Sequence, residues 1–191
     1  MQRCFDRLSA LVPMLGVLGC SDPVPASSAV GLNLTLIQSA NCPLLSGPQG
    51  PLLDDLGEPA PDLATGSKGK RVYDGDGGVS VSCTVRPTGN GSYFVSASVA
   101  SRNPRVAINV QSGSIDSNGM GTALIGLSSQ ALPGNVLSPS TRPCTLNVPQ
   151  PLADNVKTGA IFMHFDCPSL TAPPTYDCRA SGDIVLENCK K

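Results

Sequence analysis

The stretch VSVSCTVRPTGNGSYFVSASVA, residues 79–100, decides the fold class. On both sides of a short turn segment, apolar side chains alternate with serine and threonine, and a period of two is typical of a strand with one buried face. Asn90 and Gly91 stand between the two alternating runs, and both tolerate the positive φ angles of a tight hairpin turn. The sequence therefore predicts antiparallel strands over residues 79–86 and 93–100. The residues expected on the buried face are Val79, Val81, Cys83, Val85, Tyr93, Val95, Ala97 and Val99.

The same alternation recurs in six more segments: residues 31–42, 105–110, 122–127, 144–148, 160–167 and 183–189. The 20 Gly and 18 Pro of the chain indicate frequent turns between short elements. Short strands separated by turns predict an all-β domain, a single antiparallel β-sandwich or small barrel over residues 31–191. The apolar residues expected inside are Leu32, Leu34, Leu36, Val106, Ile108, Val110, Ala123, Ile125, Leu127, Leu146, Val148, Ile161, Met163, Phe165, Ile184 and Leu186.

Residues 43–71 interrupt this pattern with a long segment rich in proline and glycine. The segment has no sustained period and is expected to be a loop, with one helical turn between Pro51 and Gly57. A long ordered loop in a compact domain is often functional, so this loop is the expected contact surface. Disorder is the alternative.

The amino-terminal residues 1–19 have the features of a secretory signal peptide. Arg3 and Arg7 precede an uncharged apolar run that is too short to span a bilayer, since a spanning helix needs about 20 apolar residues. This segment is absent from a mature exported protein and contributes nothing to the fold.

The apolar run ends in VLGC, residues 17–20, which resembles the lipobox of bacterial lipoproteins. The resemblance implies that Cys20 is lipidated and becomes the first residue of the mature chain. Residues 20–30 would then be the lipidated cysteine and a flexible tether rich in Pro, Ser and Ala. By the sorting rule of many two-membrane bacteria, Ser21 implies transport to the outer membrane. The alternative is plain secretion after cleavage behind Ala29.

Six cysteines remain once Cys4 and Cys20 are set aside: Cys42, Cys83, Cys144, Cys167, Cys178 and Cys189. An even number in an exported chain predicts disulfides, whereas the wide spacing does not suit zinc. If strands 160–167 and 183–189 pair antiparallel, Cys167 and Cys189 lie at opposite ends, too far apart for a bridge. Cys178 is then the expected partner of Cys167, and Cys189 is expected to reach back to Cys42, Cys83 or Cys144.

The carboxy-terminal part, VKTGAIFMHFDCPSL followed by CRASGDIVLENC, resembles a group of uncharacterised myxobacterial-type lipoproteins. In that group a G-x-I-aromatic strand ending in F-x-C-P precedes a terminus of Gly, hydrophobic residues and E-N-C. The resemblance covers about the last thirty-five residues and implies export and a similar fold, without naming an activity.

The charge of the chain argues against one class of partner. Without residues 1–19 the chain has 11 basic and 13 acidic side chains, and no basic patch dominates, so nucleic acid is not an expected partner.

Three short motifs follow the order used by penicillin-binding proteins and serine β-lactamases: SKGK at 67–70, SRN at 101–103 and KTG at 157–159. That chemistry places the nucleophilic serine at the start of a buried helix. Ser67 instead lies in a glycine-rich segment that precedes DGDGG, so the match is interpreted as coincidence. The segment DGDGG, residues 74–78, departs from the calcium-loop pattern and is expected to be a tight turn before a strand.

A patch on one strand is the remaining candidate site. If Ile161, Met163 and Phe165 point inward, then Phe162, His164 and Asp166 point outward together. This face is a candidate binding patch or general-base site, and a solvated sheet face is the alternative.

Together these features predict a lipid-anchored lipoprotein of the cell envelope that acts as a binding or structural module. Its expected partners are the membrane, through the lipid, and an envelope protein or extracellular ligand; no cofactor or metal is expected. The alternatives are a secreted hydrolase and a carbohydrate-binding module. The hydrolase lacks a convincing nucleophile and base, and the absence of Trp leaves few stacking platforms for sugars.

Overall fold

The computed structural model describes residues 27–37, 41–42, 56–57, 59, 69–102, 105–129, 132, 134–172 and 176–191. These residues form eleven strands: β1 (Ala29–Ile37), β2 (Val72–Tyr73), β3 (Ser80–Gly89), β4 (Ser92–Arg102), β5 (Arg105–Ile115), β6 (Met120–Ser129), β7 (Val136–Leu137), β8 (Cys144–Asn147), β9 (Val156–Lys157), β10 (Ala160–Ala172) and β11 (Tyr176–Glu187). A 3₁₀ turn, η2 (Asp76–Gly78), and one helical turn, α1 (Leu152–Asn155), lie between strands. In this part of the chain, no helix is long and apolar enough to span a membrane.

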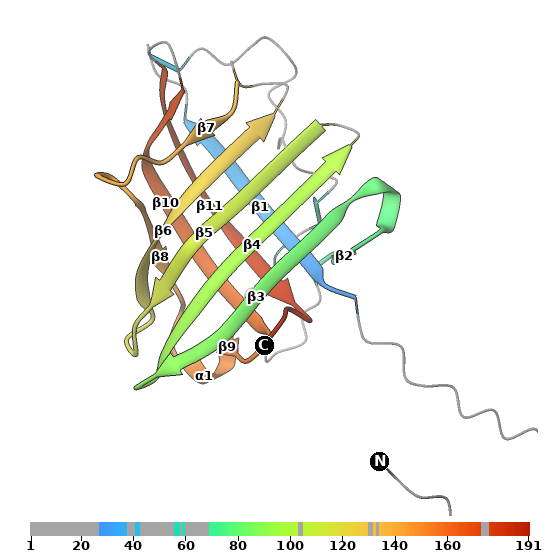
Figure 1. The fold of residues 1–191 in the computed structure, drawn as a ribbon, viewed down its shortest axis with the longest axis vertical. Coiled ribbons are helices and arrows are strands. Elements are labelled where there is room, and N and C mark those ends of the chain that lie inside the picture. The colour runs from blue at the N-terminus through green and yellow to red at the C-terminus, as the bar shows by residue number, and fades with distance from the viewer. Residues whose placement is uncertain are drawn as a thin grey trace, which may run out of the picture.

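All eleven strands belong to one sheet with antiparallel pairing. Its order is β2-β1-β11-β10-β7-β6-β5-β4-β3, with β8 paired to both β10 and β6 and β9 paired to β10. The sheet folds over on itself, so that β3 to β6 form a front layer whose strands cross β1, β11 and β10 behind it (Figure 1). The predicted all-β, sandwich-like fold is therefore confirmed.

The hairpin that decides the fold forms at the predicted place. β3 ends at Gly89 and β4 begins at Ser92, and these two residues pair across the turn. Asn90 and Gly91 between them have φ angles of 51° and 73°. Two consecutive positive φ values match the twist of the flanking strands, which is why Asn-Gly is favoured here.

The core lies between the two layers and consists of the alternating apolar residues. Phe165, Met163 and Ile161 of β10 are 0% exposed, as are Ile125 of β6 and Ile184 of β11. The residues predicted to face inward are buried, except for Leu36 and Tyr93, which pack partly buried against the core.

Three disulfides link the six predicted cysteines: Cys42–Cys178, Cys83–Cys189 and Cys144–Cys167. Cys189 reaches back to Cys83, one of the three partners expected for it. Disulfides of this number indicate an oxidising compartment, outside the cell or in its envelope.

The expected bridge between Cys167 and Cys178 is wrong. β10 continues past Cys167 to Ala172 through an irregularity in register, so Cys178 lies on β11 opposite Leu170, while Cys167 lies opposite Ala180. Cys178 is therefore a strand residue two positions out of register with Cys167. The first half of β11, which the sequence pattern did not reveal, is the reason.

The structure departs from the expected amino-terminal boundary as well. β1 begins at Ala29, two residues before the predicted start of the domain, and Ala29 and Val30 are both 0% exposed. Most of the predicted loop at 43–71 lies outside the described residues. Within it, Leu56 belongs to the core and is 1% exposed.

Candidate functional site

His164 is paired with a residue that the sequence analysis did not single out. Its Nδ1 lies 3.1 Å from Oδ1 of Asp183, the residue directly opposite on β11. Register places Asn33 of β1 beside Asp183, and Asn147 of β8 beside His164. The four residues therefore form a polar row across the outer face of β1, β11, β10 and β8, which we call the His164 row.

The predicted patch is only partly realised. His164 and Asp166 are exposed, as predicted, but Phe162 is 7% exposed and so is not available on the surface. Phe162 pairs with Val185, which is 0% exposed, so the outer side of β10 and β11 is covered near this pair. Alternation along the strand identified the face correctly, but burial of that face differs along its length.

Geometry limits the chemistry that the His164 row can perform. The side chains of His164 and Asp183 are 46% and 36% exposed, so solvent screens the pair. Because Nδ1 faces Asp183, Nε2 is the ring nitrogen left to contact a ligand. Among the described residues, no three His, Cys, Asp or Glu side chains are grouped so as to hold a metal ion.

The fragments of the penicillin-binding motif that are described have structural roles. Ser101 lies in β4 and is 5% exposed, on the inner side of the sheet. Gly159, in the turn between β9 and β10, has a φ of 85° and donates a backbone hydrogen bond to the carbonyl of Val85. Ser67, Lys68 and Asn103 lie outside the described residues.

The DGDGG segment forms the predicted tight turn before β3. Oδ1 of Asp74 accepts a hydrogen bond from the Val81 N–H at 2.8 Å, and Oδ2 of Asp76 accepts one from the Tyr73 N–H at 3.2 Å. Both carboxylates therefore bind the protein's own backbone, as Asp side chains commonly do in turns.

A shallow groove of about 390 Å³ lies on the outer face of β3, β4 and β5. Its polar lining comes mainly from Ser82, Thr84, Ser96, Ser98, Asn109 and Gln111. Within the described residues these six side chains make no hydrogen bond to another part of the chain. Phe94 also lines the groove, and the guanidinium carbon of Arg86 lies 5.2 Å from the centre of its ring. The groove therefore offers uncharged donors and acceptors beside one aromatic ring.

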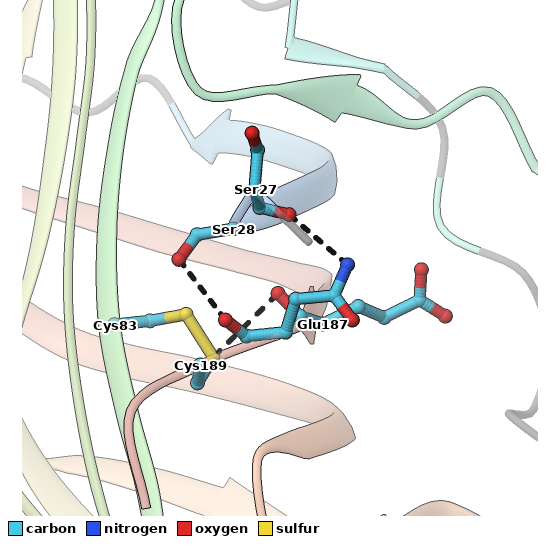
Figure 2. The surroundings of a disulfide bond; sticks show 6 residues. Ser27, Ser28, Cys83, Glu187 and Cys189 are labelled. Carbon is cyan, nitrogen blue, oxygen red and sulfur yellow. Dashed lines mark hydrogen bonds between the residues drawn. A yellow bond between two sulfur atoms is a disulfide. The ribbon is translucent and has the colours of Figure 1, made fainter. Parts of the chain in front are cut away.

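The start of β1 is held against the end of β11 (Figure 2). The Ser28 hydroxyl donates to the carbonyl of Asn188 at 3.2 Å, and the Asn188 amide donates to the carbonyl of Ser27 at 3.0 Å. The Asp74 N–H donates to the carbonyl of Ser28 at 2.8 Å. We call this arrangement the amino-terminal junction. It was not predicted, because Ser27 and Ser28 were assigned to the tether.

No family of proteins, no curated protein and no solved structure matches this chain.

Proposed function

We propose that the protein is a lipid-anchored lipoprotein of a bacterial cell envelope, in which the sandwich is a binding module. The VLGC motif suggests the anchor, and its cysteine, Cys20, lies outside the described residues. The observation that carries the proposal is the amino-terminal junction. Of the two cleavage sites, the one before Cys20 keeps the contacts of the junction and the one after Ala29 removes them.

Cleavage behind Ala29 would cut within β1. Ala29 pairs with Glu187 of β11 and Tyr73 of β2, and it is 0% exposed. A mature chain that began at Val30 would lose these pairings and the hydrogen bonds of Ser27 and Ser28 to Asn188. It would also place a charged amine at a fully buried residue, which is costly.

Processing at Cys20 retains all of these contacts. Residues 20–26 would then join the lipid to the junction, and seven residues reach at most about 25 Å. The domain would therefore be held close to the membrane surface. Ser21 after the cysteine favours the outer membrane as the destination.

The anchor is tested by mass spectrometry of the amino-terminal peptide from the native host. We expect a chain that begins at Cys20 and carries acyl groups, and we expect Cys20→Ser to release the protein from membranes. Ser28→Ala is the matched control, since it weakens the junction without changing the lipid site. An unmodified terminus at Val30 would refute the proposal.

A second candidate, carbohydrate binding, is favoured by the groove. Its volume of about 390 Å³ falls within the range of ligand-binding clefts. Uncommitted hydroxyl and amide groups beside Phe94 suit a neutral, hydroxyl-rich ligand such as a glycan. Calorimetric titration with neutral oligosaccharides tests this. Binding should be lost in Ser98→Arg and retained in Thr145→Arg, a change on an exposed residue of β8.

A further inference from the structure

β3 is the last strand in the order of the sheet, so no further strand among the described residues pairs with its outer edge. Its composition favours pairing with an identical strand. Residues 79–85, VSVSCTV, carry no charge and are rich in β-branched residues. A strand of this kind presents a row of unpaired backbone groups to other chains, and proteins usually block such an edge with charges, proline or a covering segment. In β3 the charge and the proline come only at Arg86 and Pro87, after the uncharged run.

The first part of this edge is blocked by the turn before it. The Val79 N–H donates to the carbonyl of Asp76 at 2.8 Å, and the Val79 carbonyl accepts from the Gly75 N–H at 2.9 Å. The next outward N–H, that of Val81, donates to Oδ1 of Asp74 at 2.8 Å. The DGDGG turn therefore occupies the backbone groups of β3 up to the Val81 N–H.

The second part is blocked by the residues that follow β11. The Lys190 N–H donates to the carbonyl of Cys83 at 2.9 Å, and the Lys190 carbonyl accepts from the Val85 N–H at 3.0 Å. Lys190 thus makes a parallel bridge with Thr84. The disulfide between Cys83 and Cys189 holds this segment in place (Figure 2). We call residues 188–191 the carboxy-terminal plug.

Without the plug, a continuous docking pattern would be open. The Cys83 carbonyl and the Val85 N–H would lose Lys190. The Val81 carbonyl and the Cys83 N–H already lack a partner among the described residues. An added antiparallel strand requires an acceptor at residue 81, a donor and an acceptor at residue 83, and a donor at residue 85.

We propose that the carboxy-terminal plug keeps β3 from pairing with β3 of a second copy of this protein. A second copy is the partner that fits, because an antiparallel pairing of two identical edges is two-fold symmetric and presents the same acceptors and donors on both sides. With Cys83 opposite Cys83 of the second copy, Ser82 would meet Thr84 and Ser80 would meet Arg86 on the outer face, and neither pair brings like charges together. The plug is thus an intramolecular substitute for the second strand.

Native mass spectrometry of the mature protein in detergent tests this proposal. Cys83→Ala/Cys189→Ala removes the covalent link between the plug and β3, and deletion of residues 190–191 removes the two hydrogen bonds between Lys190 and β3 while leaving the disulfide. In both variants we expect a dimer, with an association constant raised by about tenfold or more over the unmodified protein. Hydrogen exchange should show protection of the amide at position 83 in the dimer.

Two controls distinguish dimerisation through β3 from a general loss of stability of the fold. Cys144→Ala/Cys167→Ala removes a different disulfide, leaves the plug in place and should remain monomeric. Ser82→Lys/Thr84→Lys, added to the variant that lacks residues 190–191, places the two new lysines of one copy opposite those of the other and should restore the monomer. A plug-deleted variant that is folded by circular dichroism and still monomeric would overturn the proposal. Equal dimerisation of the Cys144→Ala/Cys167→Ala variant would overturn it too.

Discussion

Gly182 of β11 lies so close to Asn33 of β1 that no side chain fits between them. A Cβ atom at position 182 would collide with the carbonyl oxygen of Asn33 and would lie 3.0 Å from Cζ of Phe165 in the core. Close packing of β1, β10 and β11 explains why glycine stands there.

Gly182→Ala should therefore lower the free energy of unfolding by about 1 to 3 kcal/mol, since overpacking a core forces backbone shifts of this cost. Urea denaturation measures the loss. Gly134→Ala is the control, because a Cβ atom at that position meets nothing within 4 Å. Equal losses in both variants would show that the close approach to Asn33 does not matter.

Asp74→Ala should destabilise the fold by about 1 to 3 kcal/mol, because it leaves the partly buried Val81 N–H without its charged acceptor. Thermal unfolding measures the effect. The matched change Asp76→Ala removes the longer, exposed contact to Tyr73 and should cost less. A larger loss from Asp76→Ala would contradict this ranking of the two carboxylates.

Acid should weaken the turn between β5 and β6. The backbone N–H of Met120 donates to Asp116, as does that of Asn118, and these bonds lower the pKa of Asp116 below its ordinary 3.8 although desolvation opposes them. A lowered pKa gives stability that is present above 3.8 and is lost as pH falls through the folded-state value. Asp116→Asn should therefore show a smaller loss of melting temperature on acidification than the unmodified protein. An unchanged acid response in that variant would argue against this role.

The loss of stability on removing a disulfide should increase with the length of chain between its two cysteines. Cys42–Cys178 and Cys83–Cys189 span 136 and 106 residues, whereas Cys144–Cys167 spans 23. By loop-closure entropy, the two long bridges contribute about 5 kcal/mol each and the short one about 3 kcal/mol. Denaturation of paired Cys→Ala variants tests the order, and nonreducing peptide mapping tests the pairing. Recovery of Cys167 joined to Cys178 would contradict the structure.

Alternation along single strands was sufficient to predict the fold class and the core. VSVSCTVR and YFVSASVA specify their buried faces, and Asn90-Gly91 specifies the turn that makes them neighbours. These signals are local, because a period of two and a positive φ are properties of the chain itself.

Relations between distant strands could not be predicted in the same way. The sequence places His164 and Asp183 on outward positions, but only the register of β10 with β11 makes them a pair. Cys178 was misassigned because YDCRAS, the first half of β11, lacks an apolar alternation strong enough to identify a strand. Alternation places Phe162 on the outer face, but it does not reveal that this face is covered near Phe162.

Because β1 pairs with β11, the sheet of this protein can be completed only late in export. During passage from the amino terminus, β1 emerges first but its neighbour β11 emerges last, so it has to wait unpaired while β3 to β6 can already form hairpins. Cys144–Cys167 can be oxidised once 23 residues have followed Cys144, whereas Cys83–Cys189 requires 106 residues after Cys83. Until Cys189 has emerged, the native partner of Cys83 is absent, so any disulfide that Cys83 forms before then is non-native and has to be exchanged later.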